Sequence, residues 1–505
     1  MIRVLDVKSM RESDAATIAA GTPGRELMGR AGEGIFRAAA WKPPVAVVCG
    51  KGNNAGDGYV LALLLRETGI PCELLLESER FTPDGAYWHD RCRERNIPER
   101  LWRDTVSLRG CGSVADCIFG TGFRGNATGE AARMIDLINE SGAYVVSADI
   151  NSGLNGDSGM AEKAVRSDLT VSVGFYQPGH FLNRAMDLMA RRENVEIGIA
   201  PLGPNRFLLE AADAASFFPP REHFANKGTY GYVGLIGGSL RYSGAVRLAA
   251  MAAGAMRAGA GVVKIGVPRS LCEPLMPLIL ESTLFPLTEE GTGNGFKEEE
   301  WAELMRGLRC IAMGMGMGNS EGTRRGLAFL LEHYTGILIV DADGLNAMAE
   351  LLRERPELLR QAACRVVLTP HPGEFSRLTG RTVPEIQAEG LQLAEDFARE
   401  QGVTLLLKGP ATLVTDGHVT YLTDRGCAGM ATAGSGDVLS GVLAALFGAH
   451  PEEPTALTAA AGAWLNGRAG EIAQEGMGDV SMTAGDTAAA IPRAIRALRE
   501  EGGSR

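Results

Sequence analysis

Short runs of β-branched and other apolar residues alternate with helical patterns along almost the whole chain. In the first half we expect strands near 45–49, 72–77, 115–119, 143–149 and 169–174, and helices over, for example, 59–68 and 131–140. In the second half we expect strands near 231–236, 261–267, 309–313, 336–341, 365–369 and 403–408. Such alternation is typical of βαβ units, whose parallel strands are covered by helices on both faces.

Residues 199–226 interrupt this alternation. Pro201, Pro204, Pro219 and Pro220 punctuate the stretch, and we interpret it as an irregular link between two domains. A chain of 505 residues is also too long for one ordinary core. We therefore predict two three-layer α/β/α domains, one over residues 1–205 and one over residues 215–505.

Composition narrows the class of protein. A net charge of −11 argues against a broad nucleic-acid surface, which needs clustered Lys and Arg. Charges interrupt the first residues before any signal peptide could form, and no run of 18 apolar residues predicts a membrane span. Nine scattered cysteines without a Cys-x-x-Cys pair fit reduced thiols. We expect a cytoplasmic enzyme that binds neither nucleic acid nor membrane.

The loop Ala433-Gly434-Ser435-Gly436-Asp437 stands directly before a helix with one apolar face. A helix N-terminus offers unpaired N–H groups and the positive end of the helix dipole, which suit a phosphate oxyanion. Asp437 could then accept a proton from a substrate hydroxyl. The alternative is an ordinary helix cap with a glycine turn.

Further loops with polar or glycine-rich sequences follow predicted strands, so they should share one edge of the sheet. Lys408-Gly409-Pro410-Ala411-Thr412 is either a phosphate clamp or a solvated turn. Carboxylates in the segment 341–346 could hold Mg²⁺, directly or through water, or cap a helix. Other such loops lie at 237–239, 314–318 and 371–374. The chain contains no Gly-x-x-x-x-Gly-Lys-Ser/Thr, so a nucleotide must be held in another way.

Taken in order, these motifs resemble the ADP-dependent NAD(P)HX dehydratases, which are ribokinase-like proteins. The resemblance covers about residues 215–500 and rests on the segments 226–228, 236–239, 242–245, 341–346, 371–374, 408–412 and 430–437. The usual Gly-Pro-Gly-Leu-Gly of that family is Gly-Met-Gly-Met-Gly here, at 314–318. The resemblance implies an ADP site at Lys408, Gly409, Pro410, Ala411, Thr412, Gly434, Ser435 and Gly436. It implies a hydrated-nucleotide site at Ala245, Gly316, Gly318, His371 and Asp437.

A second glycine-rich loop, 49–58, joins a buried strand to a helix in the first half of the chain. Its spacing is not that of the ordinary dinucleotide fingerprint, and as a lone motif it fits a phosphate site and a simple turn equally well. The loops at 120–126 and 149–153 should lie at the same sheet edge. Asp149 ends a strand and is our expected acid/base group, whereas Asp116 alone would be read as a buried structural carboxylate.

These loops, with the N-terminal segment 21–32, resemble the Rossmann-like NAD(P)HX epimerase domain across about residues 1–200. The resemblance implies that hydrated nucleotide contacts Asn53, Asn54, Ala55, Gly56, Asp57, Gly120, Thr121, Gly122, Phe123, Arg124, Gly125, Asn126 and Asp149. It also implies a K⁺ site at Asn54, Asp116 and Ser152.

Both domains on one chain resemble the bifunctional NAD(P)HX repair enzymes. The implied substrates are NADHX and NADPHX, with ADP as co-substrate and K⁺ as a cofactor. We also expect Mg²⁺, on the general grounds of phosphoryl transfer. The epimerase domain would interconvert the R and S epimers, and the dehydratase domain would dehydrate the S epimer as ADP becomes AMP and phosphate. Since both families assemble, we expect a homo-oligomer. The alternatives are a ribokinase-like small-molecule kinase and an N-terminal module that binds nucleotide without catalysis.

Overall fold

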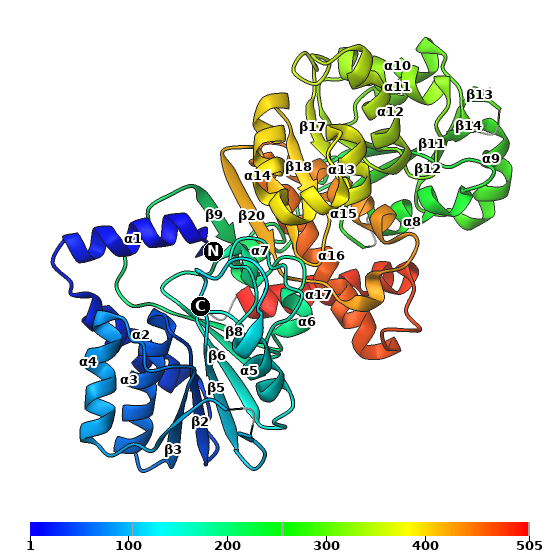
Figure 1. The fold of residues 1–505 in the computed structure, drawn as a ribbon. Coiled ribbons are helices and arrows are strands. Elements are labelled where there is room, and N and C mark those ends of the chain that lie inside the picture. The colour runs from blue at the N-terminus through cyan, green and yellow to red at the C-terminus, as the bar shows by residue number, and fades with distance from the viewer. Residues whose placement is uncertain (104, 254–256, 292, 503–505) are drawn as a thin grey trace. The chain divides into compact units, whose positions relative to one another are not determined.

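The computed structural model describes residues 1–103, 105–253, 257–291 and 293–502. Contacts divide the chain into a unit of Arg3–Asn205, here called the N-unit, and a unit of Met1–Ile2 with Arg206–Arg505, the C-unit. Figure 1 shows the elements of both. Among the described helices, none is long and apolar enough to cross a bilayer.

The N-unit is built around a parallel sheet in the order β4-β3-β2-β5-β6-β7-β8. Its strands are β2 (Val45–Cys49), β3 (Cys72–Leu76), β4 (Glu99–Leu101), β5 (Ser113–Cys117), β6 (Tyr144–Ala148), β7 (Leu169–Val173) and β8 (Arg192–Val195). Its helices are α1 (Val7–Ala19), α2 (Gly24–Ala38), α3 (Asn53–Glu67), α4 (Pro83–Glu94), α5 (Gly129–Asn139) and α6 (Ala185–Leu188).

Alternate residues of these strands face opposite sides of the sheet and fill two separate cores. On one side Val45 and Val47 pack with residues of α2 and α3, including Ile35 and Leu61. On the other side Ala46 and Val48 pack with α5. The three-layer arrangement predicted from the alternation is confirmed, and the sheet order reverses between β2 and β5, where ligands bind in folds of this kind.

The C-unit contains a larger sheet in the order β1-β9-β20-β19-β18-β17-β16-β15-β10-β11-β12. The strands from β18 to β12 in this order are parallel, and β19 is antiparallel to both of its neighbours, β18 and β20. The strands are β1 (Ile2–Arg3), β9 (Asn205–Leu208), β10 (Tyr232–Ile236), β11 (Val262–Pro268), β12 (Thr283–Leu287), β15 (Cys310–Met313), β16 (Ile337–Val340), β17 (Arg365–Leu368), β18 (Thr404–Leu407), β19 (Thr412–Thr415) and β20 (Val419–Thr423); β13 (Glu289–Glu290) and β14 (Gly293–Asn294) form a small separate sheet.

Helices pack against this sheet, as expected for an α/β/α domain. The helices are α7 (Ala211–Ala215), α8 (Ser243–Ala253), α9 (Arg269–Leu275), α10 (Glu298–Met305), α11 (Glu321–His333), α12 (Ala342–Glu354), α13 (Pro372–Thr379), α14 (Val383–Gln401), α15 (Ser435–Ala449), α16 (Thr455–Met477) and α17 (Ala484–Gly502). One face of the sheet packs with α8, α15, α16 and α17 in a continuous apolar core. The crossover helices α11, α12 and α14 join successive parallel strands on the other face.

The expected irregular link over 199–226 is wrong in part, because it contains β9 and α7. Arg206 of β9 is buried and forms an ion pair with Glu395 of α14, with nitrogen–oxygen distances of 2.7 and 2.8 Å. Because prolines lie on either side of this short strand, a prediction based on turn residues assigns the whole segment to a loop. Asp416 and Gly417 lie in the turn between β19 and β20, which pair as an antiparallel hairpin.

Candidate active sites

The first site lies at the carboxyl edge of the C-unit's sheet, where α15 begins. Gly434 precedes the helix with φ of 94°, a conformation that favours glycine, and Ser435 donates its hydroxyl hydrogen to the Met430 carbonyl. Asp437 stands in the first helical turn. Burial and, second, the neighbouring Asp341 raise the pKa of Asp437 to about 7, although Lys408 acts in the opposite direction. Such a carboxylate exchanges protons near neutral pH.

Lys408 faces Asp437 from the end of β18. Its ammonium lies 2.9 Å from one carboxylate oxygen of Asp341, and 3.8 Å from Glu374. The other Asp341 oxygen accepts a hydrogen bond of 2.8 Å from Ser440. Although burial lowers the pKa of Lys408, Asp341 and Glu374 outweigh it and the pKa is raised. The lysine therefore stays charged beside the loop, and a side chain at Gly436 would lie 3.4 Å from its nitrogen.

The glycine-rich loop 314–318 lies beside this centre, close to the segment 242–245 and to Asp343. A Cβ at Gly316, whose φ is 64°, would lie 2.7 Å from the Tyr242 Cβ and 3.0 Å from that of Ala245. Gly318 donates its N–H to Asp343 over 2.8 Å. The aspartates of the segment 341–346 therefore do not cap α12 through their side chains. Asp341 holds Lys408, and Asp343 fixes the glycine loop.

His371 is the N-cap of α13, and its Nδ1 accepts the backbone N–H of Gly373 over 3.0 Å. With Nδ1 as acceptor, a neutral ring carries its proton on Nε2, on a side chain that is 50% exposed. The remaining residues expected at the ADP site are Gly409 and Pro410, which are exposed, Ala411, which is buried, and Thr412, which opens β19. Lys408 is the member of that segment that faces Asp437.

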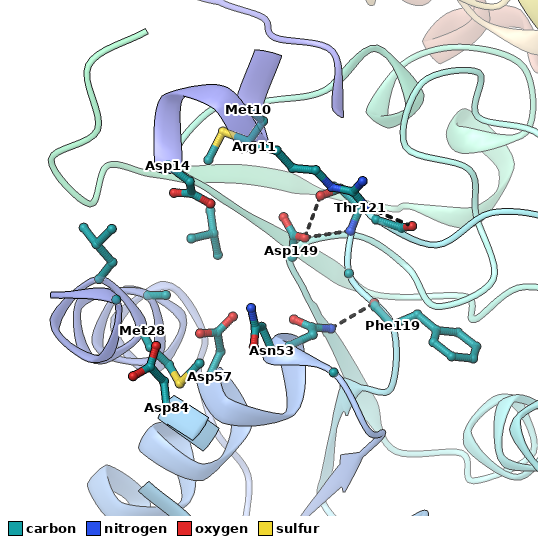
Figure 2. A pocket seen from close by; sticks show the side chains of 18 of the residues that line it. Met10, Arg11, Asp14, Met28, Asn53, Asp57, Asp84, Phe119, Thr121 and Asp149 are labelled. Atoms are coloured by element: carbon teal, nitrogen blue, oxygen red, sulfur yellow. Dashed lines mark hydrogen bonds between the residues drawn. The ribbon is translucent and has the colours of Figure 1, made fainter. Parts of the chain in front are cut away.

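The second site lies at the switch point of the N-unit's sheet, where the loops after β2, β5 and β6 meet. Figure 2 shows the cavity they enclose, which measures about 660 Å³. The lining includes Asn53, Asn54, Asp57, Thr121 and Asp149. Apolar side chains from α1, α2 and β7 complete it, among them Met10, Leu27, Met28 and Val173. Apolar walls disfavour charge on the polar groups they surround.

Asp149 has a left-handed backbone, with φ of 64°, which is uncommon for any residue but glycine. The N–H and hydroxyl of Thr121 both donate to its Oδ2, at 2.8 and 3.0 Å. His180 Nε2 lies 2.8 Å from the Asp149 carbonyl, while His180 Nδ1 accepts the N–H of Gln177. Burial lowers the pKa of His180 to about 4, so the ring is neutral and donates to that carbonyl. Burial raises the pKa of Asp149.

Two further carboxylates share this cavity with Asp149. Asp57 lies in the first turns of α3, and Asp14 projects from α1 (Figure 2). Burial and then the charge of Asp149 raise the pKa of Asp57, and the same two causes raise the pKa of Asp14 to about 6. Asp14, His180 and Ser440 escaped the sequence reasoning. Asp14 and Ser440 lie within helices, and His180, in the segment after β7, reaches Asp149 only through tertiary packing.

The loop residues expected to contact nucleotide divide into two groups. Gly120, Thr121, Gly122 and Phe123 line the cavity, and Phe123 stacks on Phe119 with ring centroids 4.4 Å apart. Arg124 instead forms an ion pair of 3.6 Å with Asp157, and Gly125 and Asn126 are exposed outside the lining. Ala55 and Gly56 are buried behind it, where a Cβ on Gly56 would meet Met28 at 2.3 Å.

The three residues expected to bind K⁺ lie together. Asp116 is fully buried and accepts hydrogen bonds from Ser147, from Ile118 and from both the N–H and hydroxyl of Ser152. Asn54 donates to the Phe119 carbonyl over 2.9 Å, but its own buried Oδ1 has no hydrogen-bond partner. A buried, unpaired oxygen beside other oxygens fits a hard cation. Within the described residues, no group of three or more His, Cys, Asp or Glu side chains is arranged to hold a metal.

Comparisons with known proteins agree with this two-site architecture. Residues 233–493 match the family model described as NAD(P)H-hydrate dehydratase, and residues 24–179 match that of the YjeF-related protein N-terminus. The bifunctional NAD(P)H-hydrate repair enzyme Nnr of Moorella thermoacetica is 36% identical over 476 residues, which cover 90% of this chain and 88% of that one. The enzyme of the same name from Escherichia coli is 32% identical, with 93% and 89% covered.

A solved structure of a hypothetical protein from Streptococcus mutans resembles part of the chain. It has a TM-score of 0.50 and 23% identity, and the match covers 58% of this chain and 100% of that one. At that identity the likeness concerns the fold.

Proposed function

The chain belongs to the bifunctional NAD(P)H-hydrate repair enzymes, and on that premise we propose how its two units divide the work. Enzymes of this family repair hydrated NADH and NADPH by epimerisation and by dehydration. We assign epimerisation to the domain of residues 1–205 and ADP-dependent dehydration to the domain of residues 215–505. The match of residues 233–493 to the dehydratase model supports this division.

Dehydration requires a better leaving group than hydroxide. Asp437 takes the proton of the C6 hydroxyl, and the oxygen attacks the β-phosphorus of ADP, so that AMP leaves. The C6–O bond of the phosphate ester then breaks as the ring-nitrogen lone pair forms a C=N bond, and loss of a C5 proton restores the dihydropyridine. The observation that supports this most is Asp437, with a pKa of about 7, in the first turn of a helix and facing Lys408.

The residues around Asp437 serve the transferring phosphoryl group. The N–H groups at Gly434–Gly436 and the ammonium of Lys408 stabilise its negative charge. Gly409–Thr412 would hold the rest of ADP, and Ala245, Gly316, Gly318 and His371 would line the hydrated nicotinamide. Because Asp341 and Asp343 are engaged by protein donors, Mg²⁺ would be held chiefly by nucleotide phosphates and water.

In the epimerase site Asp149 is the acid/base group that acts on the C6 hydroxyl. The nucleotide is held by Asn53, Asp57 and Gly120–Phe123, and the more distant Arg124–Asn126 would contact its outer part. K⁺ would sit at Asn54, Asp116 and Ser152 and supply positive charge that orders the loops after β2 and β5. We also propose a homo-oligomer, which light scattering at several protein concentrations tests.

The test uses chemically hydrated NADH containing both epimers. With protein and ADP, NADH absorbance should recover fully, and AMP and phosphate should appear in equal amounts. Absence of ADP-dependent recovery would contradict the dehydratase assignment. Phosphorylation of a sugar or vitamin with ATP, without NADH recovery, would instead support the small-molecule kinase.

A further inference from the structure

The epimerase cavity contains an acidic side chain that the proposed function has not used. Asp14 stands on α1 and lines the same cavity as Asp149, which directly follows β6. Figure 2 shows Asp14, Asp57 and Asp149 projecting into one space from three different elements. The Oδ2 atom of Asp149 accepts hydrogen bonds from Thr121, whereas no residue that the structure describes forms a hydrogen bond with Asp14. Two walls of the site therefore each present a carboxyl group.

We propose that Asp14 is a second acid/base group of the epimerase, and that C6 of the hydrated nicotinamide lies between Asp14 and Asp149 while water leaves one face and returns to the other. This inference rests on the proposed epimerase function of the N-unit. It also chooses between the two chemical routes that C6 permits, which are loss and return of water and opening of the C6–N1 bond.

The same two steps convert either epimer into the other. One carboxyl group gives its proton to the C6 hydroxyl, the C6–O bond breaks, and water departs as the N1 lone pair forms a C6=N1 bond. A water molecule then attacks C6 from the opposite face, the C=N electrons return to N1, and the second carboxylate takes the proton of the attacking water. One water is lost and one is gained, one proton moves between the aspartates, and nothing is oxidised or reduced.

Loss of water leaves the nicotinamide ring positively charged, and the acidic side chains around the cavity would stabilise that charge. Asp57 adds a third carboxyl group, and Asp84 also lines the cavity. The two basic side chains of the lining have partners within that lining, since Arg11 donates to the Gly122 carbonyl and Lys51 forms an ion pair of 2.7 Å with Glu77. Acidic side chains therefore remain in excess around the cavity. Opening the ring would produce a neutral aldehyde, which gains less from several carboxylates than a positively charged ring does.

The protonation of the cluster also fits an acid and a base in one site. The raised pKa values of Asp14 and Asp57 both include the charge of Asp149 as a cause, after burial. Like charges in one cavity are relieved when one member keeps a proton. Near neutral pH the cluster can therefore present a protonated carboxyl to one face of the ring and an ionised one to the other.

The first test measures conversion of purified R epimer to S epimer by the full chain without ADP, with spontaneous epimerisation subtracted. Asp14→Asn should lower kcat by about 100-fold or more while KM changes by less than about 3-fold. Asp14→Glu should recover part of the rate, and the limb of the pH profile near pH 6 should disappear in Asp14→Asn. Glu12→Gln, an exposed position on the same helix, is the matched control and should behave as wild type.

The second test follows oxygen. In water enriched in ¹⁸O, each epimerisation by the wild-type chain should place one solvent oxygen on C6, whereas ring opening would retain the original oxygen. Retention of that oxygen, or wild-type kcat in Asp14→Asn, would overturn the inference. Failure of the wild-type chain to accelerate epimerisation would instead contradict the proposed function, so the two failures are distinguishable. A thermal melt of Asp14→Asn that matches wild type excludes unfolding as the cause of a lost rate.

Discussion

The two sites each contain an aspartate at the edge of a sheet, and they differ in the charged side chains around that aspartate. Each has an aspartate at the carboxyl edge of a parallel sheet, with a pKa raised by burial. In the C-unit, Asp437 faces the partly buried cation Lys408. In the N-unit, Asp149 faces Asp14 and Asp57. The difference matches the chemistry, because a transferring phosphoryl group is anionic and a nicotinamide ring that has lost hydroxide is cationic.

The two aspartates are also held in different ways. Asp437 occupies an ordinary helical turn, where the glycine before the helix absorbs the unusual backbone angle. Asp149 itself has the left-handed angle and is kept there by Thr121 and His180. Strained residues persist where the surroundings over-determine them, and we expect the N-unit site to depend more on its supporting residues.

The largest effect should follow from removing the base of the C-unit. Asp437→Asn should lower ADP-dependent dehydration of the S epimer by at least about 10³-fold, because the neighbouring carboxylates Asp341 and Asp343 are engaged by protein donors. NADH absorbance after addition of ADP measures this. Epimerisation by the same variant should remain at the wild-type rate, and its loss would show that the two sites are not independent.

The corresponding change in the N-unit should leave dehydration intact. Asp149→Asn should lower enzymatic conversion of the R epimer by about 10²- to 10³-fold, since the amide neither gives nor takes the proton. Use of the S epimer should be unchanged. Unaltered R-epimer conversion, after subtraction of the spontaneous rate, would refute the assignment of Asp149.

Removing the partly buried cation Lys408 tests the contrast in charge directly. Lys408→Met should lower dehydration by about 10²-fold and move the pH profile to higher pH, because Lys408 lowers the pKa of Asp437. Leaving Asp341 without its partner should also cost up to about 3–5 kcal/mol of stability. Lys408→Arg keeps the charge and should retain the fold, while Lys297→Met changes an exposed lysine of the same unit and serves as the control. A profile that does not move would contradict the role of Lys408.

His180→Leu tests the support of the strained aspartate. Loss of the hydrogen bond to the Asp149 carbonyl should lower epimerisation by about 10-fold, through kcat more than KM. His180→Gln, which can donate to the same carbonyl, should restore part of the rate. Because the ring is neutral above a pKa of about 4, His180 should add no inflection to the pH profile between pH 5 and 9. Such an inflection, removed by the variant, would point to a titrating role instead.

The smallest effect concerns stability. The fold raises the pKa of Asp437 from 3.8 to about 7, so the native state binds more protons than the unfolded state between these values. Stability from this group is therefore present at low pH and falls as pH rises toward 7. Asp437→Asn should be more stable than wild type at pH 8, and the difference should shrink toward pH 4 in urea unfolding experiments. A difference that grows toward low pH would contradict the raised pKa.

Much of both sites could be predicted because parallel strands end at one edge of a sheet. That rule brings the loops after β2, β5 and β6 together, and likewise the ends of β16, β17 and β18. It could not place Asp14, whose helix precedes the first strand of the N-unit sheet and follows no strand of that sheet. Nor could it find β9, because a four-residue strand between prolines has too few residues to show a period.

Residues within helices were missed for a related reason. Ser440 and His180 act through hydrogen bonds to Asp341 and to the Asp149 carbonyl, and such pairs depend on tertiary packing over 99 and 31 residues of sequence. The sequence likewise does not predict the partners of Asp341 and Asp343, because their carboxylates could bind Mg²⁺ or cap a helix. The structure assigns their side chains to Lys408 and Ser440, and to Gly318.

Complementation between two inactive chains tests the central claim most directly, that one chain carries two separate active sites. The Asp437→Asn chain and the Asp149→Asn chain are each incubated with pure R epimer and ADP, alone and then mixed, and NADH absorbance is followed. We predict no NADH from the first chain, only the spontaneous rate from the second, and recovery near the wild-type rate from the mixture. A mixture no faster than the second chain alone would contradict the account.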